Sequence, residues 1–232
     1  ELVGIDMGRE IRIGAATRIR DIQDSPLLRQ ICPILPLVGS KIGYTQIRNI
    51  GTIGGNICNA SPAADLAPAL MVLNASLECA SLKGVRKVSV NDFFLGPGKT
   101  ELRRNEIVTR FHIPREDNSV SFAFRKVPAR SSKGLAVSSV VVLVKIKGER
   151  IDYARIATGA MGPTPIRCFA AEQMLKGERI TRGLIKNVSE NVVHETAPIT
   201  DVRASKEYRE HLFQVISAQA LSEVFKDNLR LN

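Results

Sequence analysis

Tryptophan is absent from the sequence, and aromatic residues make up only 5% of its 232 residues. Proteins that bind single-stranded nucleic acid stack the bases on aromatic side chains, so nucleic acid is not an expected partner even though the net charge is +10. The lysines and arginines are scattered along the chain, which is typical of a solvated surface. Long apolar runs are also missing, since the strongest one, residues 137–146, is about half the length of a membrane-spanning helix.

Cysteine is scarce, and no two cysteines have the spacing of a metal site. None of the four stands in a CxxC or CxxxC pair, and the three histidines are isolated, so no iron–sulfur or structural zinc site is expected within the chain. Scattered free cysteines and the lack of a secretion signal at the start predict a cytoplasmic protein. The chain begins at Glu1 rather than at a methionine, which is typical of a processed chain or of part of a longer protein.

Turn residues and hydrophobic periodicity divide the chain into two predicted domains, 1–117 and 118–232, at the polar segment 115–119. Ser25 and Pro26 predict a helix start, and Pro33 and Pro36 predict a bend in that helix. Strands are predicted at residues 11–15, 75–81, 86–90, 106–113, 120–127, 136–147 and 150–161. Helices are predicted at residues 168–176, 181–195 and 205–228. Strands followed by helices predict an α+β second domain, with a three-stranded antiparallel sheet and a helical bundle.

Residues 43–74 combine groups that bind phosphate. Gly54 and Gly55 have no Cβ and can take a positive φ, so that backbone N–H groups can converge on a phosphate oxygen. Thr52 and Ser61 add hydroxyl groups, and Asn56 adds a side-chain amide. On spacing alone, a tight turn between two secondary-structure elements is the simpler interpretation of the glycine pair.

Asp65 is the carboxylate of this stretch. It stands just before an apolar segment, residues 66–73, whose leucines and alanines have helical spacing. A carboxylate at this place can be a helix N-cap, which stabilises a helix by about 1 kcal/mol. It can also be a group that holds a ligand, and the residues alone leave both interpretations open.

Five separated motifs follow one another in the order found in one protein family. They are TQIRN-x-GTIGGN-(x4)-SPAADLAP at 45–68, FFLGPGKTELRRNEIVTRFHIP at 93–114, Lys126 with Arg130 in a Lys-x-x-x-Arg pattern, IATGAMGPTPIR at 156–167, and DVRAS at 201–205 with Tyr208 and Arg209. Together they resemble the FAD-containing medium subunits of molybdenum hydroxylases, such as xanthine dehydrogenase and carbon monoxide dehydrogenase. The resemblance spans nearly the whole chain.

The resemblance implies a fold for each predicted domain. Residues 1–117 are expected to form the second half of an FAD-binding (PCMH-type) domain, with a mixed or antiparallel sheet and helices. Residues 118–232 are expected to be similar to the C-terminal domain of the carbon monoxide dehydrogenase flavoprotein. The expected fold class is therefore α+β throughout.

FAD is the cofactor that the resemblance implies. Thr52, Gly54 and Gly55 would face its diphosphate and ribityl groups, with Asn56 and Ser61 nearby. These are backbone N–H groups, hydroxyls and an amide, which are the donors that a diphosphate accepts from.

Other residues are expected near the flavin ring. By resemblance, Asp65 would hydrogen-bond the cofactor, and Ile107 or Val108 would supply a backbone or apolar contact. Lys126 would lie near the flavin, where a cation stabilises negative charge on the reduced ring. The alternative for Lys126 is a solvated lysine at the edge of a strand.

One part of the family pattern is missing from these residues. The family has a separate AGG-type glycine-rich loop in a first half of the FAD domain, and Gly4 and Gly8 do not reproduce it. Each missing charge-assisted hydrogen bond is worth roughly 1.5–3 kcal/mol. We therefore expect the 232 residues alone to bind FAD weakly or not at all.

The implied role is electron transfer by an oxidoreductase subunit, with no catalytic acid, base or nucleophile and no metal site of its own. Substrate would be hydroxylated on a large molybdenum-cofactor subunit, and electrons would pass through a small [2Fe–2S] subunit to FAD and then to an external acceptor, in a hetero-oligomer. Two alternatives stay open: a flavin-free assembly module or split subunit, and a nucleotide-phosphate binder unrelated to flavin. Neither the substrate nor the acceptor follows from the sequence.

Overall fold

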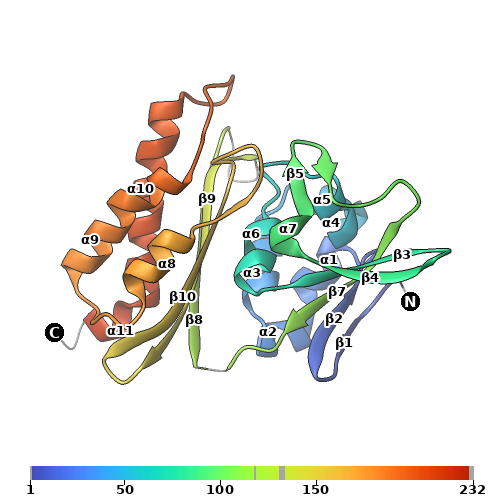
Figure 1. Cartoon of the computed structure of the whole chain (residues 1–232), viewed down its shortest axis with the longest axis horizontal. Coiled ribbons are helices and arrows are strands. Elements are labelled where there is room, and N and C mark those ends of the chain that lie inside the picture. The colour runs from blue at the N-terminus through green and yellow to red at the C-terminus, as the bar shows by residue number, and fades with distance from the viewer. Residues whose placement is uncertain (1, 118, 131–133, 230–232) are drawn as a thin grey trace.

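The computed structural model describes residues 2–117, 119–130 and 134–229. Figure 1 shows two lobes side by side, residues 2–117 with the N-terminus and residues 119–229 with the C-terminus. Asn118, which belongs to the predicted boundary segment, lies outside the described residues. Both lobes combine helices with antiparallel sheets, which confirms the expected α+β class.

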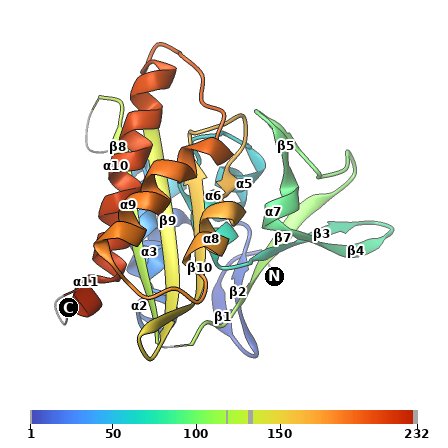
Figure 2. The same cartoon turned by 60° about the vertical axis from the view of Figure 1, so that its left-hand side comes forward.

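A five-stranded sheet organises the first lobe. Its order is β1 (Ile5–Met7), β2 (Glu10–Gly14), β7 (Ile107–Pro114), β3 (Ser76–Ser81) and β4 (Gly84–Ser89), and every neighbouring pair is antiparallel. Period-two alternation buries Ile11, Ile13 and Phe111 on the inner face. The β3–β4 hairpin turns at Gly84, whose φ is +131°, and it projects from the body of the lobe in Figure 2.

Short helices cover the inner face of this sheet. They are α1 (Ile19–Asp24), α2 (Pro26–Ile31), α3 (Ile34–Ser40), α4 (Thr45–Ile50), α5 (Ile53–Cys58), α6 (Leu66–Val72) and α7 (Val90–Phe93), and the two-stranded ribbon β5 (Phe94–Gly96) and β6 (Lys99–Thr100) follows α7. The expected cap is present, because Ser25 Oγ accepts from the N–H of Leu28 at 3.2 Å. The expected bent helix is instead two helices, α2 and α3, because the chain leaves helical geometry at Cys32.

The second lobe is built on a sheet with the order β11 (Ile166–Arg167), β10 (Arg150–Gly159), β9 (Ala136–Lys147) and β8 (Val120–Pro128). The three long antiparallel strands were predicted, and the two-residue strand β11 adds a fourth. The helices that follow are α8 (Phe169–Leu175), α9 (Arg182–Asn191), the 3₁₀ helix η1 (Val192–Glu195), α10 (Lys206–Val224) and α11 (Lys226–Leu229). As predicted, the chain leaves the helix after α8 at Gly177, which has a φ of +80°.

The second sheet is buried on both faces. Val140, Val142 and Val144 of β9 pack into the core under α8–α10, whereas Val141 and Leu143 pack into the core of the first lobe. Figure 1 shows this sheet between α10 on one side and α6 on the other. Double burial explains why residues 140–144 of β9 are apolar without interruption rather than alternating with polar residues. The two lobes therefore share apolar packing across their junction.

Helix α6 is the central element of that junction. All seven of its residues are buried, between the first-lobe helices and strands β9 and β10. At its C-terminal end, Arg155 donates to the carbonyl of Val72 and Arg167 donates to the carbonyl of Met71, both at 3.0 Å. These cations satisfy carbonyls that lack partners within the helix. In the described part of the chain, no helix has the length and apolarity needed to cross a membrane.

Candidate functional site

The glycine-rich segment lies in helix α5 rather than in a loop. Thr52 is the N-cap of α5, and its Oγ1 accepts from the N–H of Gly55 at 3.0 Å. Neither Gly54 nor Gly55 has a positive φ, so the expected left-handed backbone is not present here. The N–H of Gly54 donates to the carbonyl of Ala15 at 2.8 Å, so both glycine N–H groups have partners within the protein.

The two glycines differ in what surrounds them. A Cβ on Gly54 would lie 2.6 Å from the carbonyl oxygen of Ala15, so glycine lets α5 pack directly on the end of β2. Gly55 is exposed, and a Cβ there would meet only Thr52 Oγ1, at 3.1 Å. Gly54 therefore serves packing, and Gly55 keeps the surface of the first turn of α5 free of a side chain.

Asp65 and Lys126 come together across the junction of the lobes. Lys126 Nζ of β8 donates to Asp65 Oδ2 at 2.6 Å, and the two side chains are only 7% and 6% exposed. Asp65 occupies the N-cap position of α6 but makes no capping hydrogen bond, and Lys126 is not a solvated lysine. The structure thus excludes the simpler interpretation of each residue. Lys126 Nζ also donates to the carbonyl of Lys41, at 3.3 Å.

The Asp65 carboxylate is only partly satisfied. Burial raises its pKa, and the Lys126 ammonium opposes that shift. Its second oxygen, Oδ1, is buried and has no hydrogen-bond partner among the described residues, and the same holds for Asn56 Oδ1. A buried acceptor without a donor is costly in a folded protein. Both oxygens are suited to accept from a hydroxyl or imide N–H of a bound ligand, and FAD carries both kinds of donor.

The other predicted site residues have separate settings. Ser61 Oγ accepts from the N–H of Ala63 at 3.3 Å, within the loop that precedes Asp65. On β7, Val108 is buried in the first core, whereas Ile107 is 59% exposed on the opposite face of the sheet. Of these two, only Ile107 has an exposed side chain.

Ser139 and Gly159 belong to this region and were missed by the sequence analysis. Lys126 is opposite Ser139 in the β8–β9 pair, and Ser139 is opposite Gly159 in the β9–β10 pair. Ser139 is 1% exposed and its Oγ has no partner among the described residues. A Cβ on Gly159 would lie 2.8 Å from that Oγ. A serine inside the apolar run of β9 was the signal that could have identified this position.

A cleft of about 280 Å³ lies beside the loop that leads to Asp65. Its walls come from both lobes: Ser61, Pro62, Ala63, Pro97, Ala160, Gly162, Pro163, Ile199, Asp201, Arg203 and Arg209. Because Ser61 and Pro62 line it, this cleft borders the candidate site.

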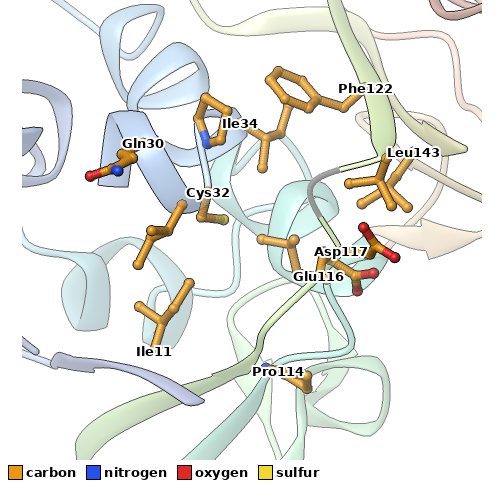
Figure 3. A pocket seen from close by; sticks show the side chains of 13 residues that line it. Ile11, Gln30, Cys32, Ile34, Pro114, Glu116, Asp117, Phe122 and Leu143 are labelled. Atoms are coloured by element: carbon orange, nitrogen blue, oxygen red, sulfur yellow. The ribbon is translucent and has the colours of Figure 1, made fainter. Parts of the chain in front are cut away.

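A second cavity, of about 140 Å³, is remote from these residues. Figure 3 shows its apolar wall, including Ile34, Phe122 and Leu143, with the carboxylates of Glu116 and Asp117 on one side. Glu116 is engaged by Arg155 and Tyr153, so it is not a free acid or base. Burial raises the pKa of Cys32, which also lines the cavity, to about 12, so its thiol is not a nucleophile. None of the predicted cofactor residues lines this cavity.

A cluster of titratable groups occupies the outer face of the first sheet. His112 lies between two carboxylates, with Nδ1 2.5 Å from Glu10 Oε1 and Nε2 3.2 Å from Glu78 Oε2. Glu78 Oε1 also accepts from Thr109 Oγ1 at 2.6 Å. These hydrogen bonds lower the pKa values of both glutamates. Within the ranges that the structure describes, no group of three His, Cys, Asp or Glu residues is arranged to hold a metal ion.

Comparison with known families assigns both lobes. Residues 1–116 match the FAD binding domain in molybdopterin dehydrogenase, and residues 122–224 match the CO dehydrogenase flavoprotein C-terminal domain. The chain is 34% identical to the putative xanthine dehydrogenase FAD-binding subunit XdhB of Escherichia coli K12, over 96% of this chain and 77% of that protein. It is also 34% identical to the glyceraldehyde dehydrogenase medium chain of Sulfolobus acidocaldarius, over 92% of this chain and 75% of that one.

Solved structures show the same fold. A chain of the Hydrogenophaga pseudoflava carbon monoxide dehydrogenase that lacks the Mo-pyranopterin moiety superposes with a TM-score of 0.94, at 27% identity, over 97% of this chain and 78% of that one. A chain of quinoline 2-oxidoreductase from Pseudomonas putida 86 gives a TM-score of 0.91, at 26% identity, over 97% of this chain and 79% of that one.

Proposed function

The chain belongs to the FAD-binding subunits of the molybdenum hydroxylase family, and we propose that it carries electrons within such an enzyme from iron–sulfur clusters, by way of FAD, to an external acceptor. It is an oxidoreductase subunit with FAD as its cofactor. When bound, FAD supplies the two-electron and one-electron chemistry that amino-acid side chains lack. The part of this chain is to hold the cofactor and to set the electrostatics around it.

The buried pair of Asp65 and Lys126 is the observation that carries this proposal. Asp65 Oδ1 is a buried acceptor without a donor, and Lys126 places a positive charge beside it. In a region of low dielectric, a fixed cation raises the stability of nearby negative charge more than it would in water. Lys126 would therefore favour the reduced, more negative form of a flavin bound next to it, and Asp65 would orient that ring through Oδ1.

The remaining predicted residues would line the rest of the site. Thr52, Gly55 and Asn56 stand at the first turn of α5, where Gly55 leaves the surface open and Asn56 Oδ1 lacks a partner. Gly54 would act indirectly, by letting α5 pack on β2. Ser61 would contact the cofactor from the loop before Asp65.

The wider assembly is also part of the proposal. Residues 1–117 would be the second half of the FAD domain and residues 118–232 a separate C-terminal domain, in a hetero-oligomer with a large molybdenum-cofactor subunit and a small [2Fe–2S] subunit in the cytoplasm. Relatives such as the nicotine 6-hydroxylase medium subunit of Paenarthrobacter nicotinovorans, 29% identical over 94% of this chain, are named as subunits, which supports such an assembly.

Native purification tests this proposal. The protein is purified together with the chains that accompany it, and its flavin, iron and molybdenum contents are measured along with the absorbance spectrum. We expect one FAD per copy of this chain. The flavin absorbance should bleach when the substrate of the complex is added, because the substrate reduces the flavin. A preparation that contains the partner chains and their metals but no flavin would favour the flavin-free module instead.

A further inference from the structure

Arg209 is an almost completely buried cation in the first turn of α10. It is 2% exposed, and its Nη1 donates to the carbonyl of Val137 at 2.6 Å and to that of Ala160 at 3.1 Å. Its Nη2 donates to Asp201 Oδ1 at 2.7 Å. A buried guanidinium requires such a counter-charge and such acceptors, because desolvation is otherwise too costly. The side chain is thus fixed by three acceptors from three segments of the second lobe.

Ala160 connects this arginine to the first lobe. Its carbonyl accepts from Arg209, while its N–H donates to the carbonyl of Pro62 at 2.7 Å. Ala160 has a φ of +61°, a left-handed conformation that a non-glycine residue adopts only when its surroundings hold it there. The hydrogen bonds on both sides of Ala160 supply that restraint.

The acceptor on the first-lobe side is part of the loop that leads to Asp65. Pro62 stands three positions before Asp65, and the same loop is tied at Ala60, whose carbonyl accepts from the N–H of Gly98 at 3.0 Å. Beyond Asp65 the chain enters α6, all of whose residues are buried. The position of Pro62 therefore restrains where the Asp65 carboxylate stands relative to Lys126.

We propose that Arg209 is a positioning residue for the flavin site, which acts through Ala160 and Pro62 to hold Asp65 opposite Lys126. The inference rests on the proposed function, since it requires Asp65 to contact FAD. Arg209 also lines the 280 Å³ cleft beside Ser61 and Pro62, so its loss leaves that loop facing a space into which it can move. In this account a residue of the second lobe sets the affinity and potential of a cofactor held largely by the first.

Arg167 is the matched control in the same lobe. Its side chain is 7% exposed, it pairs with the buried Glu172, and it crosses to the first lobe to reach Met71 and Asn74. It therefore resembles Arg209 in burial, charge and contact between lobes. It differs in its target, because Met71 and Asn74 lie at the C-terminal end of α6, away from the Asp65 loop.

The test compares Arg209→Gln, Arg209→Lys and Arg167→Gln in the natively purified protein with its accompanying chains. The FAD dissociation constant, the flavin midpoint potential and the melting temperature are measured for each. We expect Arg209→Gln to displace Asp65 and so to remove the charge-assisted hydrogen bond between Asp65 and FAD. This loss should weaken FAD binding by about tenfold or more and should also shift the flavin midpoint potential. Arg209→Lys, which keeps the charge but not the planar fork, should lie between it and the wild type. Arg167→Gln should lower the melting temperature without changing affinity or potential.

Two results would overturn the inference. One is an Arg209→Lys or Arg209→Gln protein that melts earlier but keeps the affinity and potential of the wild type. The other is an Arg167→Gln protein whose flavin properties change as much as those of Arg209→Gln, since the effect would then be general loosening of the junction. Asp65→Asn separates this inference from its premise: if Asp65→Asn also leaves FAD binding unchanged, the proposed site itself is wrong.

Discussion

Lys126 and Asp65, 61 positions apart in the sequence, form a buried ion pair that joins strand β8 of one lobe to the start of helix α6 in the other. The pair leaves one carboxylate oxygen without a donor. A buried ion pair is a poor source of net stability, because desolvation offsets the attraction of the charges. Its cost is understandable if the two groups also bind the cofactor.

Breaking this pair from one side should destabilise the protein strongly. Asp65→Asn leaves the Lys126 ammonium buried without a counter-charge, so we expect the free energy of unfolding to fall by roughly 3–5 kcal/mol, and Lys126→Met to act similarly. The double variant should lose less than the sum, with a coupling of about 0.5–3 kcal/mol. Urea denaturation of the four proteins measures these differences, and strictly additive losses would contradict the pairing.

The two glycines of α5 should respond differently to alanine. Gly54→Ala forces a Cβ against the backbone of Ala15, and overpacking of this kind costs about 1–3 kcal/mol. Gly55→Ala meets only the side chain of Thr52 and gains helix propensity, so its stability should stay within about 1 kcal/mol of the wild type. Melting temperatures of the two variants give the comparison. Equal losses would show that the close approach of α5 to β2 is not what Gly54 provides.

Sequence reasoning succeeded where a single residue type determines local geometry. Ser25 caps its helix as predicted, and Gly177 ends one with a positive φ. It failed for α4 and α5, because helices of six residues are marginal on their own and exist through packing, and α5 also contains a glycine pair. Packing also explains why Gly54 and Gly55, interpreted from the sequence as part of a phosphate-binding loop, lie in the first turn of a helix.

The geometry of the candidate site did not follow from the sequence. Resemblance to the family pointed to Asp65 and Lys126 individually, whereas their ion pair depends on how two distant segments pack. The ties between Arg209, Ala160 and Pro62 are of the same kind, because each contact joins segments that no local pattern relates. Ser139 could be recognised in the sequence as a polar residue in an apolar strand. Its place opposite Lys126, with a buried and unpartnered hydroxyl, depends on strand pairing and could not be predicted.

Acid should destabilise the first sheet through the cluster at His112. Hydrogen bonds between Glu10 and His112, and between Glu78 and both Thr109 and His112, hold the pKa values of both carboxyls below the ordinary value of 4.5. A carboxyl whose pKa is lowered by folding contributes stability above the unfolded pKa and loses it as the pH falls through the folded one. We therefore expect stability to decline below about pH 4.5.

Glu78→Gln isolates this contribution. The variant keeps the shape of the side chain but cannot titrate, so its free energy of unfolding should depend less on pH than that of the wild type between about pH 5 and pH 3. Denaturant titrations at several pH values give the slope of the free energy of unfolding against pH for the wild type and for Glu78→Gln. Identical slopes would mean that Glu78 has the same pKa in the folded and unfolded states.

The 232 residues taken alone should bind FAD poorly. The donors found here are few, since both N–H groups of the glycine pair already have partners within the protein. Each charge-assisted hydrogen bond that is missing weakens binding by roughly 1.5–3 kcal/mol. Fluorescence titration of the isolated chain with FAD measures this, and a sub-micromolar dissociation constant would contradict the expectation.

The flavin midpoint potential of a Lys126 variant decides whether the Lys126–Asp65 pair is part of the flavin site. In the natively purified protein, Lys126→Gln removes the cation proposed to stabilise the reduced flavin. The control is Lys145→Gln, which removes a lysine of β9 that pairs with Asp117 at the surface. We predict that Lys126→Gln makes the potential more negative by about 30 mV or more, equivalent to about 1.4 kcal/mol for a two-electron couple, and that Lys145→Gln leaves it unchanged. An unchanged potential in Lys126→Gln, with flavin still bound, would contradict a flavin site at the Lys126–Asp65 pair.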